Sequence, residues 1–272
     1  MKWYKPSTSI ARIRARAHIA DPAFDRIDLR STIAEESNPM DEQDAAAPPT
    51  PTDTESEPTL IAAAGLGVDG EHGPLFSDID LELTAGFHAI QMPGGPGQTA
   101  LLLTLAGRLK PTHGTVTVLG DTQPRAIRRH CAIAAFDEID ELEESVTVQT
   151  VLAEQRRWLA PWYSRVPKQA GQTELGQVFG EIPPPSAESY IVELSDLDLF
   201  LLRITLALFS NRPVLVVGDL EQVRDNSRRA IAVERLGAIA TQRTVVVGVT
   251  NPLGTAAPDH ELHDHRILTE RG

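Results

Sequence analysis

Cysteine is almost absent from this sequence of 272 residues, which contains only Cys131. A single cysteine excludes an intramolecular disulfide framework and agrees with a reducing compartment. Its expected role is that of a small buried hydrophobe. Long apolar runs are absent as well: the most apolar stretch, Leu197 to Phe209, is short and is interrupted by Asp198 and Arg203. This stretch predicts a buried core helix and no membrane span.

An apolar segment of the kind found in secretory signals is also missing near the basic N-terminus, so no such signal is expected. Positive charge is in deficit, with 25 Lys and Arg against 38 Asp and Glu and a net charge of −13. This balance argues against a nucleic-acid partner, because phosphate would be repelled over most of the surface. The hydrophobic content of 41% is ordinary for a globular protein. Any membrane association is therefore expected to be peripheral or through a partner.

Three regions differ in composition. Residues 1–34 carry seven Lys and Arg and three Asp, and apolar residues at helical spacing predict a short amphipathic helix (Ile10, Ile13, Ala17, Ala20). This region is interpreted either as a contact for an anionic membrane or a partner groove, or as a weakly ordered tail. Residues 35–58 are acidic and rich in Pro and Thr, which predicts a disordered linker. Residues 59–272 form the expected folded domain.

The folded domain shows an α/β pattern. Strands are expected at 60–64, 76–83, 87–92, 115–119, 132–136, 214–217 and 244–249, and helices at 99–109, 147–160, 196–209 and 226–239. Residues 160–190 are expected to be irregular. Continuous apolar strands separated by helices predict a parallel sheet that is covered on both faces.

A glycine-rich loop lies between the strand ending at Met92 and the following helix. Its sequence is PGGPGQTA, in which Gly94, Gly95 and Gly97 allow backbone N–H groups to approach a phosphate. Thr99 stands where a hydroxyl would bind Mg²⁺, next to Ala100. The order of strand, loop and helix is therefore that of a phosphate-binding loop.

Two positions in this loop depart from the phosphate-loop motif. Met92 replaces its first glycine, and Gln98 replaces its lysine. A neutral amide cannot supply the cation that the lysine places between the β- and γ-phosphates. Two unit charges about 4 Å apart interact by roughly 4 kcal/mol at an effective dielectric constant near 20. We therefore expect triphosphate binding to be weakened by tens- to a thousand-fold.

The segment around this loop resembles the opening of an ABC-transporter nucleotide-binding domain. The resemblance covers GPLFSDIDLELTAGFHAIQMPGGPGQTALLLTLAGRLKPTHGTVTVLGD, and further landmarks follow in order to about residue 271. It implies a three-layer P-loop NTPase fold with a mixed or parallel sheet, an antiparallel β lead-in and a small helical subdomain at about 145–205. It also implies ATP and Mg²⁺ as ligands, both weak or vestigial in this chain.

Two landmarks of the family are altered in the middle of the chain. The Q-loop position, which in the family links the metal site to the helical subdomain, carries Asp137. Asp137 is interpreted either as a residue that meets a metal ion or as a solvated loop acid. The signature segment begins Leu194-Ser195-Asp196, so Asp196 and Leu197 replace its glycines. They are expected to form a negative, bulky edge that opposes a phosphate from a partner subunit.

The last landmarks follow two buried strands. Asp219 ends the Walker B strand, where the resemblance implies a role in the Mg²⁺ shell. Leu220 occupies the general-base position and cannot accept a proton. Glu221 is a weak candidate for a substitute base, because strand alternation predicts that it points elsewhere. Asn251 replaces the switch histidine, and His72 is a weak candidate to stack on adenine.

The preferred hypothesis is an ABC-type ATP-binding subunit with impaired or absent hydrolysis, peripheral at the cytoplasmic face of the cell membrane. Its expected partners are a transmembrane permease, or another membrane protein, and a second ATP-binding subunit in a homodimer or heterodimer. One alternative is a non-catalytic scaffold that needs no nucleotide. Another is an active ATPase with Glu221 as the base. A P-loop kinase or GTPase is set aside, because no guanine-reading motif follows the strands.

Overall fold

The computed structural model describes residues 58–137, 139–163, 165, 167 and 171–253, and the backbone of residues 261–264. The predicted basic extension at 1–34 and nearly all of the predicted linker at 35–58 lie outside these residues. The chain divides into two units, Met1–Glu55 and Ser56–Gly272, and the described residues all lie in the second. No helix among the described residues is long and apolar enough to cross a membrane.

The described chain alternates strands and helices. In order they are β1 (Ile61–Gly70), β2 (Gly73–Leu83), β3 (Phe87–Gln91), α1 (Pro96–Leu105), β4 (His113–Val118), α2 (Pro124–His130), β5 (Cys131–Ala134), α3 (Val148–Leu159), α4 (Gln172–Phe179), α5 (Asp196–Leu208), β6 (Val214–Asp219), α6 (Asn226–Ala240), β7 (Thr244–Val249) and β8 (Glu261–Asp264). Two 3₁₀ turns, η1 (Ile191–Glu193) and η2 (Leu220–Gln222), precede α5 and follow β6.

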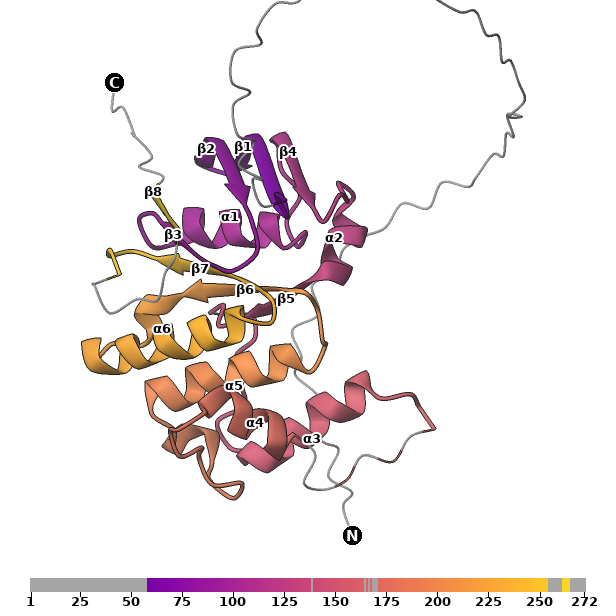
Figure 1. Cartoon of the computed structure of the whole chain (residues 1–272), viewed down its shortest axis with the longest axis vertical. Helices are drawn as coiled ribbons and strands as arrows, with labels where there is room; N and C mark the ends of the chain where they lie inside the picture. Colours follow the sequence, from indigo (N-terminus) through magenta and orange to yellow (C-terminus); the bar gives the residue numbers. More distant parts are fainter. Residues whose placement is uncertain are drawn as a thin grey trace, which may run out of the picture. The chain divides into compact units, whose positions relative to one another are not determined.

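These strands form two sheets. One is antiparallel in the order β2-β1-β4, and the other is parallel in the order β5-β6-β7-β3-β8. Helix α1 lies between the sheets and contacts both, while α5 and α6 cover the other face of the parallel sheet (Figure 1). The parallel sheet covered on both faces and the antiparallel lead-in are as the sequence predicted.

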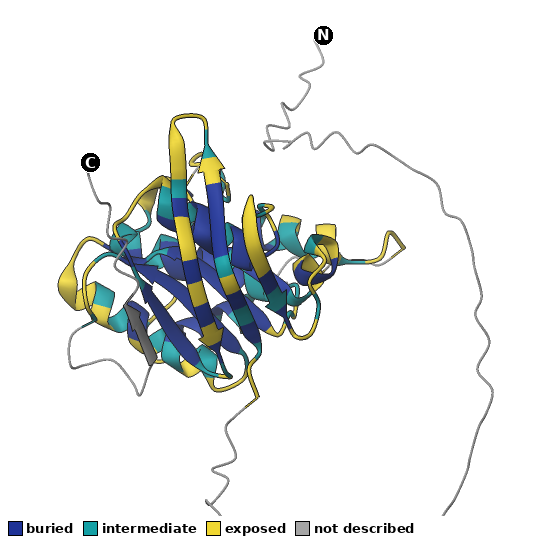
Figure 2. Ribbon diagram, turned by 90° about the horizontal axis from the view of Figure 1, so that it is seen from above, coloured by how far each residue is buried: buried dark blue, intermediate teal, exposed yellow. Residues whose placement is uncertain are grey.

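Each sheet has the hydrophobic pattern that its position requires. The six residues of β7 are all buried, as expected for a strand covered on both faces. Strand β2 alternates between buried and exposed residues, and Figure 2 shows the antiparallel sheet with its outer residues exposed. A register shift interrupts this alternation near Asp78, whose φ is 54°. This bulge lets Phe76 and Ile79, three residues apart, face the same core.

The core is divided by the parallel sheet. One cluster lies between the two sheets around α1, and the other lies under α5, α6 and the helices α3 and α4. Cys131 is fully buried in the first cluster, and burial raises the pKa of its thiol to about 12. The expectation of a small buried hydrophobe at this position is confirmed.

Among the described residues, the sequence patterns did not predict the helices α2 and α4 and the strand β8. Helix α4 lies inside the stretch expected to be irregular, and it includes Gly176, a poor helix former. Tertiary contacts stabilise it. Leu175, Val178 and Phe179 are buried, and Arg235 on α6 donates hydrogen bonds to the carbonyl oxygens of Gln177 and Val178. Local propensity therefore underestimated this helix, because its stability depends on packing.

Helix α1 begins three residues earlier and ends four residues earlier than predicted. Pro96 occupies its first turn, where a missing N–H costs nothing within the helix. The helix ends at Leu105, and Gly107 then adopts a left-handed conformation with φ of 66°. The apolar periodicity continued to Leu109, but the backbone had already turned.

Candidate functional site

The phosphate-type loop, Asp219 and Thr250 lie together at one edge of the parallel sheet. The loop follows β3, Asp219 ends β6 and Thr250 follows β7, and β6, β7 and β3 are adjacent in the sheet. The carboxyl ends of parallel strands meet at one edge, which is where ligands bind in α/β proteins. A methyl group added at Gly94 would lie 2.8 Å from Oγ1 of Thr250 and 3.4 Å from Oδ2 of Asp219.

The loop backbone depends on its glycines. Gly95 has φ of 114°, a conformation that other residues rarely adopt, and it caps the N-terminus of α1. A methyl group added at Gly97 would lie 2.6 Å from the carbonyl oxygen of Leu75 in β2. Thr99 is half-buried, and its N–H donates to the carbonyl oxygen of Gly95, while Ala100 is buried. The loop is thus held as a tight turn at the start of a helix.

Pro96 removes one donor from this cradle. It stands between Gly95 and Gly97, at the first position of α1, and proline has no backbone N–H. The anion site at a helix N-terminus depends on N–H groups that have no partner within the helix. The cradle therefore has one donor fewer than a loop with an ordinary residue here. The sequence motif is defined by its glycines and its lysine, so it says nothing of Pro96. The loss of a donor at Pro96 can be inferred only from its position in the first turn of α1.

Gln98 is turned into the protein. Its side chain is 1% exposed, and its Nε2 donates to the carbonyl oxygen of Met92 over 3.4 Å. It also packs on β7, since a methyl group added at Gly248 would lie 2.9 Å from Cδ of Gln98. A neutral amide tolerates this burial far better than an ammonium group. The buried side chain of Gln98 thus stabilises the loop, but it adds no positive charge to the cradle.

The end of β6 is acidic. Burial raises the pKa of Asp219, and the charges of Glu221 and Asp137 raise it further, against the hydrogen bond that the N–H of Glu221 donates to Oδ1 of Asp219 over 2.9 Å. A bound divalent cation would relieve this repulsion, and the carboxylate of Asp219 with the hydroxyl of Thr99 offers the oxygen ligands that Mg²⁺ prefers. The residues present therefore fit Mg²⁺ better than they fit a triphosphate alone. The described residues contain no cluster of three or more His, Cys, Asp and Glu that would hold a metal by itself.

Glu221 reaches the switch position. The prediction that strand alternation would point it elsewhere is wrong, because the chain leaves β6 and enters the 3₁₀ turn η2 at Leu220. Leu220 is fully buried in the core, while Oε1 of Glu221 accepts hydrogen bonds from the side chain of Asn251 (3.0 Å) and from its backbone N–H (3.3 Å). Oε2 of Glu221 forms an ion pair of 2.7 Å with Arg229. Both oxygens of the candidate base are therefore engaged within the chain.

Asp137 is largely exposed, with 72% of its side chain accessible. Its carboxylate lies 3.8 Å from Nη1 of Arg203, a residue on α5 whose side chain is 6% exposed. Arg203 also pairs with Asp140 over 2.5 Å and donates to Gln222 over 2.7 Å. A buried cation therefore stands beside the Q-loop position. The sequence signal for it was a positive charge inside a largely apolar helix.

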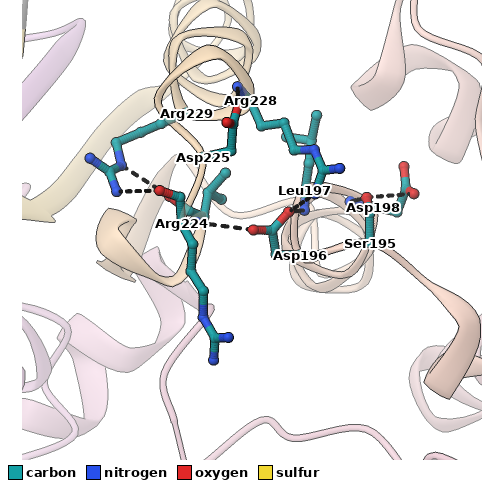
Figure 3. Close-up of polar contacts among 9 residues, drawn as sticks. Ser195, Asp196, Leu197, Asp198, Arg224, Asp225, Arg228 and Arg229 are labelled. Carbon is teal, nitrogen blue, oxygen red and sulfur yellow. Dashed lines mark hydrogen bonds and ion pairs between the residues drawn. The ribbon is translucent and has the colours of Figure 1, made fainter.

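The signature segment is bound to the chain's own α6. Figure 3 shows the carboxylate of Asp196 between the backbone N–H of Arg224 (3.0 Å) and the guanidinium of Arg228 (2.8 Å). Burial alone would raise the pKa of Asp196, but the hydrogen bonds from Arg228, Arg224 and Leu197 outweigh it and lower the pKa. Ser195 caps α5, because its Oγ accepts from the N–H of Asp198.

The expected negative, bulky edge at the signature is wrong in one respect. Leu197 is 6% exposed and packs in the core, so its side chain adds no bulk at the surface. Asp196 is half-buried and its charge is balanced by Arg228, while Leu194 before it is half-buried as well. What replaces the glycines is a carboxylate that is already paired within the chain.

His72 lies at the exposed tip of the hairpin that joins β1 to β2. Asn251 is exposed just after β7. The structure therefore brings together the loop, Asp219, Glu221 and Asn251. It adds Arg203 and Arg229, which no sequence motif had marked as site residues.

Relatives of the chain are found in sequence over short segments. No protein-family model matches it. The cytochrome c biogenesis ATP-binding export protein CcmA of Pseudomonas putida is 40% identical over 77 residues, which cover 28% of this chain and 36% of that protein. The hemin import ATP-binding protein HmuV of Gloeobacter violaceus is 39% identical over 62 residues, which cover 22% of each. The chain thus matches about a third or less of the length of these two relatives.

Solved structures match over a longer part of the chain. An ABC transporter ATP-binding protein from Pyrococcus furiosus superposes with a TM-score of 0.57 at 18% identity, covering 74% of this chain and 96% of that chain. CbiO1 from Clostridium perfringens, part of the ABC transporter complex CbiONQ, superposes with a TM-score of 0.60 at 14% identity, covering 76% and 85%. At these identities the likeness concerns the fold.

Proposed function

We propose that this chain is an ABC-type ATP-binding subunit of a transporter that binds ATP weakly and lacks efficient hydrolysis. Its likeness to ABC ATP-binding proteins in sequence and in fold supports the family part of this proposal. The observation that carries the proposal is the buried, neutral side chain of Gln98, which leaves the cradle without a cation. Mg-ATP is the expected ligand. The loop, Thr99 and Asp219 would hold its phosphates and metal.

Weak binding follows from the donors and charges at the cradle. Three carboxylates influence one another there, and Pro96 removes a backbone donor. The attraction lost with a lysine is roughly 4 kcal/mol at 4 Å and an effective dielectric constant near 20, and even half of it lowers affinity more than tenfold. Mg²⁺ at Thr99 and Asp219 would offset part of the repulsion.

Impaired hydrolysis follows from the end of β6. Leu220 is buried and cannot accept a proton, and Glu221 is held by Arg229 and Asn251. A general base needs a free oxygen within hydrogen-bond reach of the attacking water. Asn251 lacks the ionisable ring of the histidine in the family. Nucleotide binding here would therefore support a conformational change without rapid cleavage.

The proposed setting is the inner face of a membrane, in the cytoplasm, where the subunit would work with a permease or another membrane protein. The relatives named above act in export and in import. The proposal includes a dimer with a second copy or with another ATP-binding subunit. Asp196, paired with Arg228, would face that partner's nucleotide, with less repulsion than an unpaired carboxylate would exert.

A scaffold that needs no nucleotide is the second candidate. It is favoured by the contacts that already satisfy site residues within the chain: Gln98 with Met92, Glu221 with Arg229, and Asp196 with Arg228. In the first candidate these contacts are rearranged by nucleotide, and in the second they are permanent.

Titration calorimetry of the full chain with ATP and Mg²⁺ separates the two candidates. The first predicts a dissociation constant in the high micromolar to millimolar range that weakens when Thr99→Ala or Asp219→Asn is introduced. Absence of heat at millimolar nucleotide would favour the scaffold. Phosphate release should equal that of a blank. Robust turnover that Gln98→Ala abolishes would overturn the assignment of impaired hydrolysis.

A further inference from the structure

The end of α3 exposes a group of large apolar side chains. Trp158 is 73% exposed, Leu159 46%, Trp162 95% and Tyr163 74%. The whole chain has three Trp and three Tyr, so two of its tryptophans stand at the surface within five residues. Single exposed apolar residues are ordinary, but a contiguous group indicates a binding surface.

The body of the protein holds this group outward. The inner face of α3 packs Val148, Val151 and Leu152 into the core. Near its end, Arg156 pairs with Glu174 and stacks over the ring of Phe209 at 4.2 Å. Figure 1 shows α3 at the edge of the helical layer, on the far side of α5 from both sheets. Trp158 and Leu159 therefore stand at the end of an anchored helix, and Trp162 and Tyr163 follow it directly in the chain.

The rings of this group are also ordered with respect to one another. Trp162 and Tyr163 form an edge-to-face pair with their centroids 5.8 Å apart and an interplanar angle of 84°. Pro161, just before them, cannot continue the helix, so the chain turns and presents both rings beyond its end. Both rings are largely exposed, and each has a polar N–H or O–H group that can meet water or headgroups.

The charge around these rings is opposite to that of the protein. The chain has a net charge of −13, yet no Asp or Glu occurs between Glu154 and Glu174. Arg157 and Arg165 are both exposed and flank the aromatic residues in the sequence. The patch, defined as Arg157, Trp158, Leu159, Trp162, Tyr163 and Arg165, is thus a basic aromatic surface on an acidic protein.

We propose that this patch docks directly on an anionic lipid bilayer. Trp and Tyr rings settle at the level of the headgroups, where the apolar ring faces the acyl chains and the polar tip faces water. Arginine beside them is attracted to anionic lipid, and stable peripheral binding generally needs both signals. The proposed docking does not require nucleotide, so its test is independent of the test of the proposed function.

Vesicle binding tests the proposal on the full chain. Trp3→Phe leaves Trp158 and Trp162 as the fluorophores, and this parent is mixed with vesicles of phosphatidylcholine alone or with 30% phosphatidylserine. We expect cosedimentation and a blue shift of tryptophan emission only with the anionic vesicles. In the parent, Arg157→Gln with Arg165→Gln should lower the partition coefficient roughly tenfold or more. Trp158→Ala with Trp162→Ala should reduce cosedimentation to the level of neutral vesicles.

Matched controls separate this patch from other surfaces. Arg125→Gln with Arg129→Gln removes the same charge from exposed positions on α2, and it should leave binding near that of the parent. Arg12→Gln, Arg14→Gln and Arg16→Gln together test the N-terminal segment in the intact chain. Circular dichroism and melting establish that each variant is folded.

The results that overturn the proposal are equally specific. The proposal is wrong if the parent does not bind anionic vesicles, or if the folded patch variants bind them as the parent does. It is also wrong if only the N-terminal variant loses binding. A patch that binds a purified membrane protein but no vesicle would also exclude direct lipid docking.

Discussion

At the scale of single residues, nucleotide affinity depends on Gln98 and on the space around it. The side chain is buried between the loop and β7, and Gly248 leaves room for it. The amide also donates a hydrogen bond to the carbonyl oxygen of Met92, at the start of the loop. The side chain of Gln98 therefore stabilises the loop but supplies no positive charge to it. A lysine at this position would supply the positive charge but would destabilise the fold, because an unpaired buried ammonium group is costly.

The substitution Gln98→Lys should strengthen Mg-ATP binding by tenfold or more, because a cation returns to the phosphates. The same variant should melt at a lower temperature than the native chain without nucleotide and recover when Mg-ATP is added. Calorimetry and thermal melting measure the two effects. Gln98→Met is the matched control, with a similar size and no charge, and it should not improve binding. Equal affinity of Gln98→Lys and the native chain would contradict the electrostatic argument.

At the scale of elements, α5 links the helical layer to the site. Its N-terminus is held to α6 through Asp196, and its middle carries Arg203 toward the ends of β5 and β6. Arg203 contacts the carbonyl oxygen of Phe136, the carboxylate of Asp140 and the side chain of Gln222. The carboxylate of Asp140 in turn accepts the N–H groups of Ala135 and Phe136. The segment after β5 is therefore clamped by a buried ionic network.

Replacing Arg203 by Ala should lower the free energy of unfolding by about 3 kcal/mol or more, because it leaves a carboxylate uncompensated in a partly buried setting. Urea denaturation followed by circular dichroism measures the loss. Arg125→Ala, an exposed arginine on α2, should change the stability by less than about 0.5 kcal/mol. A loss below about 1 kcal/mol for Arg203→Ala would show that the network is replaceable by water.

The contact of Asp196 with Arg228 should give a specific dependence on pH. Because the folded-state pKa of Asp196 lies below its ordinary value near 3.8, its charge stabilises the fold above that pH. The contribution is lost as the pH falls through the folded-state pKa. Asp196→Asn should therefore be less stable than the native chain by roughly 1 kcal/mol at pH 7, and the difference should vanish well below pH 3.8.

Urea midpoints from pH 2 to 7 measure this difference. Glu188→Gln, an exposed acid near η1, serves as the control and should follow the native curve. A constant difference between Asp196→Asn and the native chain at all pH values would indicate lost packing and not lost charge.

At the scale of the whole molecule, the described unit carries its own core. The buried apolar residues found in the described part run from Ile61 to Val249 and pack on both faces of the parallel sheet. The acidic segment before it is expected to contribute little, since its composition cannot offset chain entropy. The folded unit should therefore be independent of the N-terminal region.

A chain that begins at Pro58 should melt within about 2 °C of the full chain, because a change of 1 kcal/mol shifts a domain of this size by roughly 2–4 °C. It should also bind Mg-ATP with the same affinity in calorimetry. The matched comparison is a chain that begins at Gly73 and lacks β1, the central strand of the antiparallel sheet. That chain should fail to fold. A large loss of stability in the first truncation would show that residues 1–57 pack on the domain.

The sequence by itself determined the order of the strands and helices apart from α2, α4 and β8, together with the parallel sheet and the glycine turn that precedes α1. Continuous apolar runs such as Val214–Val217, and residues with restricted backbone conformations, produce these features locally, so they can be read along the chain. The burial of Cys131 belongs to the same group. The identities of Gln98, Leu220 and Asn251 likewise stated which chemical groups the site lacks.

Only the tertiary structure decided where the charges act. Helix α4 forms because of its contacts with the core and with Arg235, and Glu221 reaches Asn251 because η2 breaks the strand alternation. The pairing of Asp196 with Arg228 joins residues 32 positions apart. Such contacts depend on how distant segments pack, and an ion pair has no periodicity that a sequence pattern could display. The sequence gives the identity of each side chain, and tertiary packing determines which partner it contacts.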